Sequence, residues 1–139
     1  MADGRSRIVT GEPVARFVSE RLRFGLCPPY TALGVERDGE IIGGMLLNSF
    51  EGADVHVTVA GTGWTRAFLR AAGEYVFDQL GCERVTITTE QPEVEELARR
   101  LGGQREGVLR SHFGAGRDGV IIGILRSEYR YLAPAPVFG

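Results

Sequence analysis

Residues 54–89 read DVHVTVAGTGWTRAFLRAAGEYVFDQLGCERVTITT, and the periods within this stretch decide the fold class. Valines alternate with polar side chains over 54–59, which predicts a strand with one buried face. Apolar side chains then recur every three or four residues over 64–80, which predicts a helix, and Gly81 stands where such a helix ends. A second alternating strand is predicted over 84–89. Strand, helix and strand in this order form a βαβ unit, whose strands are parallel.

The chain before this unit predicts an antiparallel meander. A short helix is expected over 13–24, followed by strands over 31–37 and 40–49. Between these strands, Asp38-Gly39 is a strong two-residue hairpin signal, because both residues tolerate positive φ. A further glycine turn leads into the first strand of the βαβ unit, which makes three antiparallel strands in succession.

The chain after the unit predicts one more helix and a closing hairpin. The helix is expected over 93–101, and two strands over 106–113 and 120–126 are joined by a glycine-rich loop over 114–119. The complete pattern predicts an α/β (α+β) fold, with a mixed central sheet of about six strands and helices on both faces.

Length and composition narrow the class of protein. A chain of 139 residues has room for one core, so we expect a single domain over 1–139 with peripheral tails at 1–12 and 133–139. Hydrophobic residues make up 43% and the net charge is −2, which excludes the disordered class and argues against nucleic-acid binding. No signal peptide and no apolar run near the roughly 20 residues that span a bilayer is recognisable. The two cysteines, Cys27 and Cys82, have no metal-binding spacing. We therefore expect a soluble, cytoplasmic protein that has no metal and does not bind membranes.

Several short fragments carry a resemblance to a known family. Residues 80–85 read LGCERV, residues 106–110 read EGVLR, residues 116–118 read GRD, and residues 123–130 read GILRSEYR. In this order they resemble the RimJ/RimL-like branch of the GNAT superfamily of N-acetyltransferases, and the likeness extends over residues 31–132. The resemblance implies the GNAT fold, acetyl-CoA as co-substrate, and transfer of acetyl to a primary amine of a protein N-terminus or a small molecule.

That family carries Gln/Arg-x-x-Gly-x-Gly/Ala between the strand and the helix of this unit, and the backbone N–H groups there hold the CoA pyrophosphate. The matching residues are 60–65, where Gly61 and Gly63 retain a tight turn but Ala60 and Thr65 depart from the pattern. The resemblance thus implies a degenerate motif. The cofactor-binding residues that it implies are Val57, Val59, Gly61, Thr62, Gly63, Trp64, Thr65, Arg66 and Gln91.

The roles in this set differ. By the resemblance, Val57 and Val59 present their backbone to the pantetheine arm, as a neighbouring strand would. Arg66 replaces the missing cation of the motif, and Gln91 stands where the family has an asparagine.

In the family, the polar face of the strand over 54–59 looks into the acceptor cleft, which points to His56 as the catalytic base. An ordinary histidine pKa of about 6.5 suits proton removal at neutral pH. Asp54, on the same face, either orients His56 or binds a cationic acceptor. The alternative is that both side chains face solvent on a half-exposed strand.

Two further clusters have a structural explanation as well as a functional one. His112 follows Ser111 on a predicted strand, where neighbours point to opposite faces, so we expect a surface role for His112 rather than a catalytic pair. The arginines between Arg99 and Arg110 either meet the ribose phosphate of CoA or form a solvated face.

A second class of function stays open, a GNAT-fold module that has lost catalysis and serves binding or assembly. Three departures from the family pattern motivate it: Ala60 and Thr65 in the pyrophosphate motif, and Gly103, which stands where the family has an aromatic residue. The open edge of the predicted sheet also makes a homodimer plausible.

Overall fold

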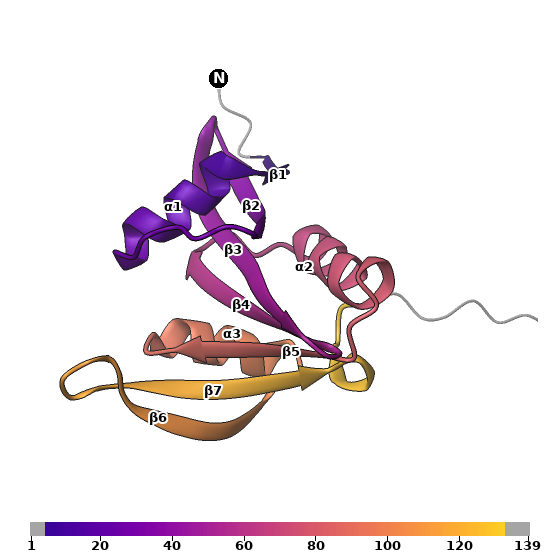
Figure 1. Cartoon of the computed structure of the whole chain (residues 1–139). Helices are drawn as coiled ribbons and strands as arrows, with labels where there is room; N and C mark the ends of the chain where they lie inside the picture. Colours follow the sequence, from indigo (N-terminus) through magenta and orange to yellow (C-terminus); the bar gives the residue numbers. More distant parts are fainter. Residues whose placement is uncertain (1–4, 133–139) are drawn as a thin grey trace, which may run out of the picture.

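Seven strands form one sheet, in the order β1-β2-β3-β4-β5-β7-β6, in the computed structural model of the protein, which describes residues 5–132 (Figure 1). The strands are β1 Ser6–Thr10, β2 Thr31–Arg37, β3 Glu40–Glu51, β4 Asp54–Gly61, β5 Arg84–Thr89, β6 Gln104–Gly114 and β7 Arg117–Leu125. The helices are α1 Glu12–Leu22, α2 Arg66–Gly73 and α3 Pro92–Arg100, with a π-helical turn, η1 Glu74–Gln79, and a 3₁₀ turn, η2 Arg126–Glu128.

The predicted architecture is confirmed. Strands β4 and β5 pair in parallel, and the other neighbouring strands pair antiparallel. The strand after β4 is reached through α2, which is the predicted βαβ unit, and β6 and β7 form the C-terminal hairpin. Helix α1 covers one face of the sheet, and α2 and α3 cover the other (Figure 1).

The strand that sequence analysis missed is β1. Residues 6–10 were expected in a peripheral tail, whereas they pair with β2 from Ser6↔Arg37 to Thr10↔Leu33. Five residues at the edge of a sheet show too short a period to stand out in the sequence, and their pairing is decided by the neighbouring strand. Residues 133–139, the other predicted tail, lie outside the described residues.

The predicted helix over 64–80 is two elements instead of one. The N–H of Leu80 donates to the carbonyl of Tyr75 at 2.8 Å, five residues back, so η1 is wider than an α-helix. Arg126 donates to the carbonyl of Phe77 at 2.6 Å and its guanidinium also meets Asp78. These contacts come from the far end of the chain, which explains why the local apolar period did not reveal the change.

The core lies on both faces of the sheet. Valines 55, 57 and 59 of β4 point toward α2 and α3, while Val14 and Val18 of α1 pack against the opposite face. Two glycines let α1 approach closely, because a Cβ on Gly34 or Gly44 would lie 2.8 Å from a valine methyl of α1. Helix α1 packs on β2, on β3 and on the end of β4 at Ala60. Other polar side chains of β4 and β5 on this face line a cavity beside the end of α1. Among the helices of the described chain, none combines the length and the apolar character that a membrane span requires.

Candidate active site

Strands β4 and β5 separate at one end. Their parallel pairing runs from Asp54↔Arg84 to Val57↔Ile87 and stops there, although β4 continues to Gly61 and β5 to Thr89 (Figure 1). Backbone groups of the last residues of β4 are therefore open on the side that faces β5. An extended ligand can pair with such groups as an additional strand does.

The carbonyl of Val59 in this separated part already has a partner. The side-chain amide of Gln91 donates to it at 2.9 Å, across the gap between β4 and the start of α3. A ligand that pairs with Val59 must therefore displace the Gln91 amide or bind beside it. This contact places Val59 and Gln91, two predicted cofactor residues, together.

The entry loop, residues 61–65, connects β4 to α2. Gly61 and Gly63 have φ values of 90° and 93°, in the left-handed region that favours glycine. A Cβ on Gly61 would collide with the carbonyl oxygen of Ile42, and one on Gly63 would lie 2.6 Å from the Ile42 side chain. The N–H of Thr62 donates to the Ile42 carbonyl at 2.8 Å. Both glycines thus allow the loop to lie against β3.

The end of the entry loop exposes backbone donors. Thr65 is the N-cap of α2, and its hydroxyl accepts from the N–H of Phe68 at 3.1 Å, so its side chain turns toward its own helix. Thr65, a departure from the family motif, therefore has a capping role. Within residues 5–132, the N–H groups of 63, 64, 66 and 67 have no acceptor. Free N–H groups at a helix N-terminus suit an anion.

Trp64 is a packing residue. Its ring lies 5.3 Å from the ring of Phe68, centroid to centroid, and it packs on the apolar cluster under α2. Its contribution to an anion site is limited to its backbone N–H.

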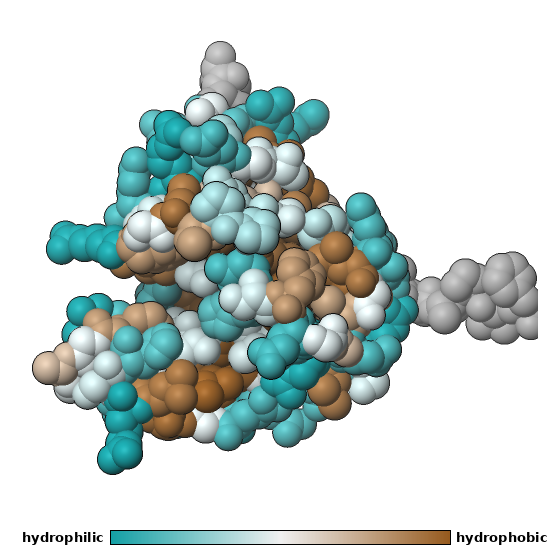
Figure 2. Space-filling model, viewed as in Figure 1, coloured by the Kyte–Doolittle hydropathy of each residue, from teal (hydrophilic) through white to brown (hydrophobic). Residues whose placement is uncertain are grey.

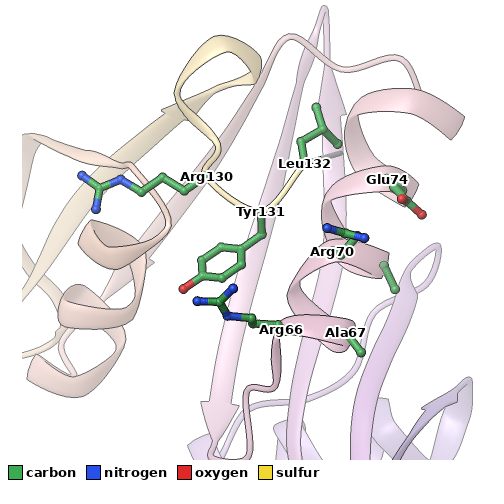
Figure 3. Close-up of a pocket in the computed structure, with 8 residues that line it drawn as sticks. Arg66, Ala67, Arg70, Glu74, Arg130, Tyr131 and Leu132 are labelled. Carbon is green, nitrogen blue, oxygen red and sulfur yellow. The ribbon is translucent and has the colours of Figure 1, made fainter. Parts of the chain in front are cut away.

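Arg66 lines a cavity of about 680 Å³ beside α2, which we call the arginine cavity (Figure 3). Arg66 and Arg70 come from successive turns of α2, and Arg130 and Tyr131 come from the segment after η2. Within the described residues, these three arginines take part in no ion pair. Arg66 and Arg70, with one acidic neighbour, Glu74, suit a phosphate, whereas the side chain of Arg130 extends away from them (Figure 3).

A larger cavity, of about 1130 Å³, opens on the face of the sheet that α1 leaves bare, and we call it the open-face cleft. Figure 2 shows the surface indented at the left edge, between α1 and the β6–β7 hairpin. The floor consists of the polar side chains of β4 and β5, and the walls are the end of α1 and the hairpin. The residues that line this cleft include Asn48, Glu51, Asp54, His56, Thr58, Val59, Thr86, Glu90, Gln91, His112 and Arg117.

His56 lies on the floor of the cleft and is half-buried. Burial lowers the pKa of its imidazole, while the nearby carboxylate of Asp54 raises that pKa and His112 lowers it. Burial is the largest of the three effects, so the imidazole is neutral at pH 7 and has a lone pair to accept a proton.

Asp54 influences His56 through space. Its carboxylate accepts from the hydroxyl of Thr86 at 2.8 Å and lies 3.6 Å from the guanidinium of Arg84. No hydrogen bond joins Asp54 to His56 in the described chain. The two predicted catalytic residues thus share the cleft, but no hydrogen bond from Asp54 orients the imidazole in the described chain.

Sequence reasoning missed the contribution of the β6–β7 hairpin. Ser111 has a φ of 55°, and its N–H donates to Asp118 at 2.8 Å in a bulge of β6. This bulge interrupts the alternation of the strand, and His112 and Arg117 line the cleft. Arg117 forms a two-bond ion pair with Glu90, at 2.9 and 2.5 Å, which lowers the pKa of that carboxyl.

The arginines between 99 and 110 take no part in either cavity. Arg99 pairs with Glu96 at 3.2 Å, and Arg105 pairs with Glu95 at 2.7 Å, on the exposed surface near α3. Of the two explanations offered for this cluster, the structure favours a solvated, ion-paired face.

Comparison with known proteins shows the fold. No family model and no curated protein matches the sequence. A mutant form of the spermidine/spermine N-acetyltransferase SpeG from Vibrio cholerae has a similar structure, with a TM-score of 0.70 and 17% identity over 90% of this chain and 97% of that one. The same enzyme in complex with CoA and spermine has a TM-score of 0.66 and 16% identity over 89% of this chain and 97% of that one. A dodecameric structure of that enzyme has a TM-score of 0.67 and 17% identity over 90% of this chain and 96% of that one.

The chain therefore has the GNAT fold, as the sequence resemblance implied. At these identities the likeness is one of fold, and it does not distinguish the RimJ/RimL-like branch from others. The chemistry of the site depends on its own residues.

Proposed function

We propose that the protein is an acetyl-CoA-dependent N-acetyltransferase that acts on a primary amine. One observation carries the proposal: the cleft that holds the neutral His56 also reaches Val59 and Gln91, where β4 and β5 separate. A base and a place for an extended acyl carrier thus meet in one cavity. A neutral base beside a bound thioester is what transfer to an amine needs.

The residues present fit acetyl-CoA. The free N–H groups after Gly63 and the N-terminus of α2 suit its pyrophosphate, and the arginine cavity suits a further phosphate. The backbone of Val59 is available to the pantetheine amides once Gln91 releases its carbonyl, whereas Val57, the other residue implied by the resemblance, still pairs with Ile87 of β5. The fold likeness to an enzyme crystallised with CoA supports this assignment.

Acetyl-CoA, when bound, supplies the activated acetyl group. His56 takes the proton that the amine loses as it attacks, directly or through one water. The floor of β4 and β5 excludes bulk water on one side, and the end of α1 and the hairpin limit the approach of the amine. Thr58, between His56 and the entry loop, lies on the same face and is available to orient the substrate.

The acceptor is proposed to be a small cationic amine or a protein N-terminus. Glu51 and Asp54 are the cleft carboxylates that can meet an ammonium group, since Glu90 is paired with Arg117. Arg21 and Arg23 at the end of α1 also line the cleft. A neighbour in fold acts on spermidine and spermine, which favours a small amine, whereas the RimJ/RimL resemblance favours a protein N-terminus. Thiol release from acetyl-CoA, measured with a polyamine panel and a peptide panel, separates the two.

The first test is calorimetry with acetyl-CoA and with free CoA. Micromolar binding supports the proposal, and absence of binding at millimolar acetyl-CoA contradicts it. In the second case the alternative applies, a binding module in which Gln91 permanently closes the gap beside Val59.

We also infer a homodimer from the sheet edge. Strand β6 is at the edge, and its Val108 and Leu109 are 47% and 39% exposed. An exposed edge strand with apolar side chains can pair with a second copy. A monomer in light scattering at working concentration would contradict this inference; the cytoplasmic setting stays a prediction.

A further inference from the structure

One buried polar side-chain atom of the described chain has no hydrogen-bond partner. Within residues 5–132, the side-chain oxygen of Asn48 is the only buried side-chain nitrogen or oxygen atom without a hydrogen bond. Buried polar atoms are nearly always bonded, and leaving one unpaired costs free energy. Asn48 lines the open-face cleft, so a ligand there can supply the missing donor once a rotation of this side chain turns the buried oxygen toward the cleft.

The position of Asn48 relative to His56 is defined by the sheet. The two residues are direct partners in the β3–β4 pairing. The preceding pair, Leu47 and Val57, points into the core on the other face, so Asn48 and His56 share the cleft face. Cβ atoms of directly opposed residues lie about 4.5–5.5 Å apart. The two side chains thus leave the sheet from neighbouring positions on the cleft face.

The backbone next to Asn48 is also unusual. Ser49 has a φ of 54°, and the β3–β4 register shifts between Asn48 and Glu51. Bulges of this kind re-aim side chains and are frequent beside active sites. The irregularity sits next to the unpaired oxygen.

We propose that Asn48 positions the acceptor amine by accepting one of its N–H groups, which makes the site selective for primary over secondary amines. This inference rests on the proposed function. A neutral primary amine has one lone pair and two N–H groups. The lone pair must point at the thioester carbon, so the two hydrogens point elsewhere, and His56 and Asn48 provide two adjacent acceptors.

The reaction balances with these groups. The amine nitrogen forms a bond to the acetyl carbon, and the carbon–sulfur bond breaks. One proton passes from the nitrogen to His56 and then to the departing thiolate. The second hydrogen stays on nitrogen as the amide N–H, still bonded to the oxygen of Asn48. A secondary amine has a single N–H and would leave this oxygen buried against an alkyl group.

The test compares two probes, trimethylenediamine and its N,N′-dimethyl derivative, in which both amines are secondary. The wild-type protein is expected to prefer the primary amine by about tenfold or more in kcat/KM, the effect of one lost hydrogen bond. Asn48→Leu is expected to remove most of this preference by lowering kcat for the primary amine. Asn48→Asp keeps an acceptor and is expected to keep the preference. An unchanged preference in Asn48→Leu overturns the proposal.

A thermal unfolding measurement separates this role from a structural one. Asn48→Leu removes an unpaired buried oxygen, so Tm is expected to rise or stay unchanged while activity falls. A fall in Tm that accompanies the loss of activity would mean that the oxygen supports the fold, and would overturn the proposal. Gln79→Ala, an exposed amide on η1 at the opposite face, is the matched control and should change neither quantity.

The same assay distinguishes failure of the proposed function from failure of the inference about Asn48. A wild-type protein that binds no acetyl-CoA and acetylates neither probe overturns the function and this inference together. A wild-type protein that acetylates both probes equally overturns the inference and leaves the function standing.

Discussion

The two parts of the candidate active site, the entry loop and the open-face cleft, are built from different kinds of atoms. The entry loop before α2 offers backbone N–H groups, with arginine side chains beside them, whereas the open-face cleft is made of side chains from five strands and one helix. A site made of backbone donors tolerates changes of residue type, as at Ala60 and Thr65, provided that the turn is kept. A site made of side chains does not, and it decides which amine is accepted.

The largest effect is expected from the side-chain site. His56→Gln removes the neutral base, so kcat/KM should fall by about a hundredfold or more, the usual contribution of such a group. Affinity for acetyl-CoA should not change, because His56 is not part of the entry loop, residues 61–65, that offers the backbone donors. Steady-state kinetics and calorimetry measure the two quantities. A loss below about threefold would favour the alternative in which His56 merely faces the cleft.

Acetyl-CoA binding at the backbone donors should be weakened by a substitution in the turn that presents them. Gly61→Ala places a methyl group against the carbonyl of Ile42, so the loop must move, and acetyl-CoA should bind at least about tenfold more weakly. Gly39→Ala is the matched control, since Gly39 has a φ of 82° but no atom near an added Cβ. Both variants carry backbone strain of about 1–2 kcal/mol. Equal acetyl-CoA affinity in the two would contradict the role of the entry loop.

The arginine cavity should contribute less. Arg66→Ala removes an exposed cation, so acetyl-CoA affinity should fall by about threefold, and the difference should shrink at high salt. Calorimetry at two ionic strengths checks this. Arg16→Ala, an exposed arginine of α1 paired with Glu12, should have no effect. A salt-independent loss would point to packing rather than charge.

The smallest expected change is a shift of the pH profile. His56 acts as a neutral imidazole, so activity rises as the pH rises through its pKa. Asp54 raises this pKa, and Asp54→Asn should therefore move the acidic limb of kcat/KM to lower pH. Asp78→Asn, which removes a carboxylate of η1 paired with Arg126, should leave the limb in place. A shift to higher pH would contradict the electrostatic role of Asp54.

The charged and titratable groups around His56 determine the direction in which its pKa should shift. Besides Asp54 on its own strand, His112 of the hairpin lowers the pKa of His56, and the ion pair between Arg117 and Glu90 lies farther along the cleft. Because that pair is neutral as a unit, Asp54 is the main negative charge whose removal His56 should sense.

Much of the fold was predictable because it depends on near neighbours. The bounds of β2 and β5 were predicted to the residue from alternation, and Asp38 and Gly39 adopt the positive φ values that their types allow. His56 and Asp54 were placed in one cavity by the same alternation. The prediction that these residues act in catalysis stays a prediction until the variants are measured.

The rest depended on contacts between distant residues. The sequence determined the βαβ unit, the meander and the polar face of β4, since each follows from side-chain period and turn chemistry within a few residues. Tertiary structure alone decided the bulge that brings His112 to the cleft, the widening of α2 into η1, and the unpaired oxygen of Asn48. These features arise where strands and helices far apart in the sequence meet, and no local pattern records such a meeting.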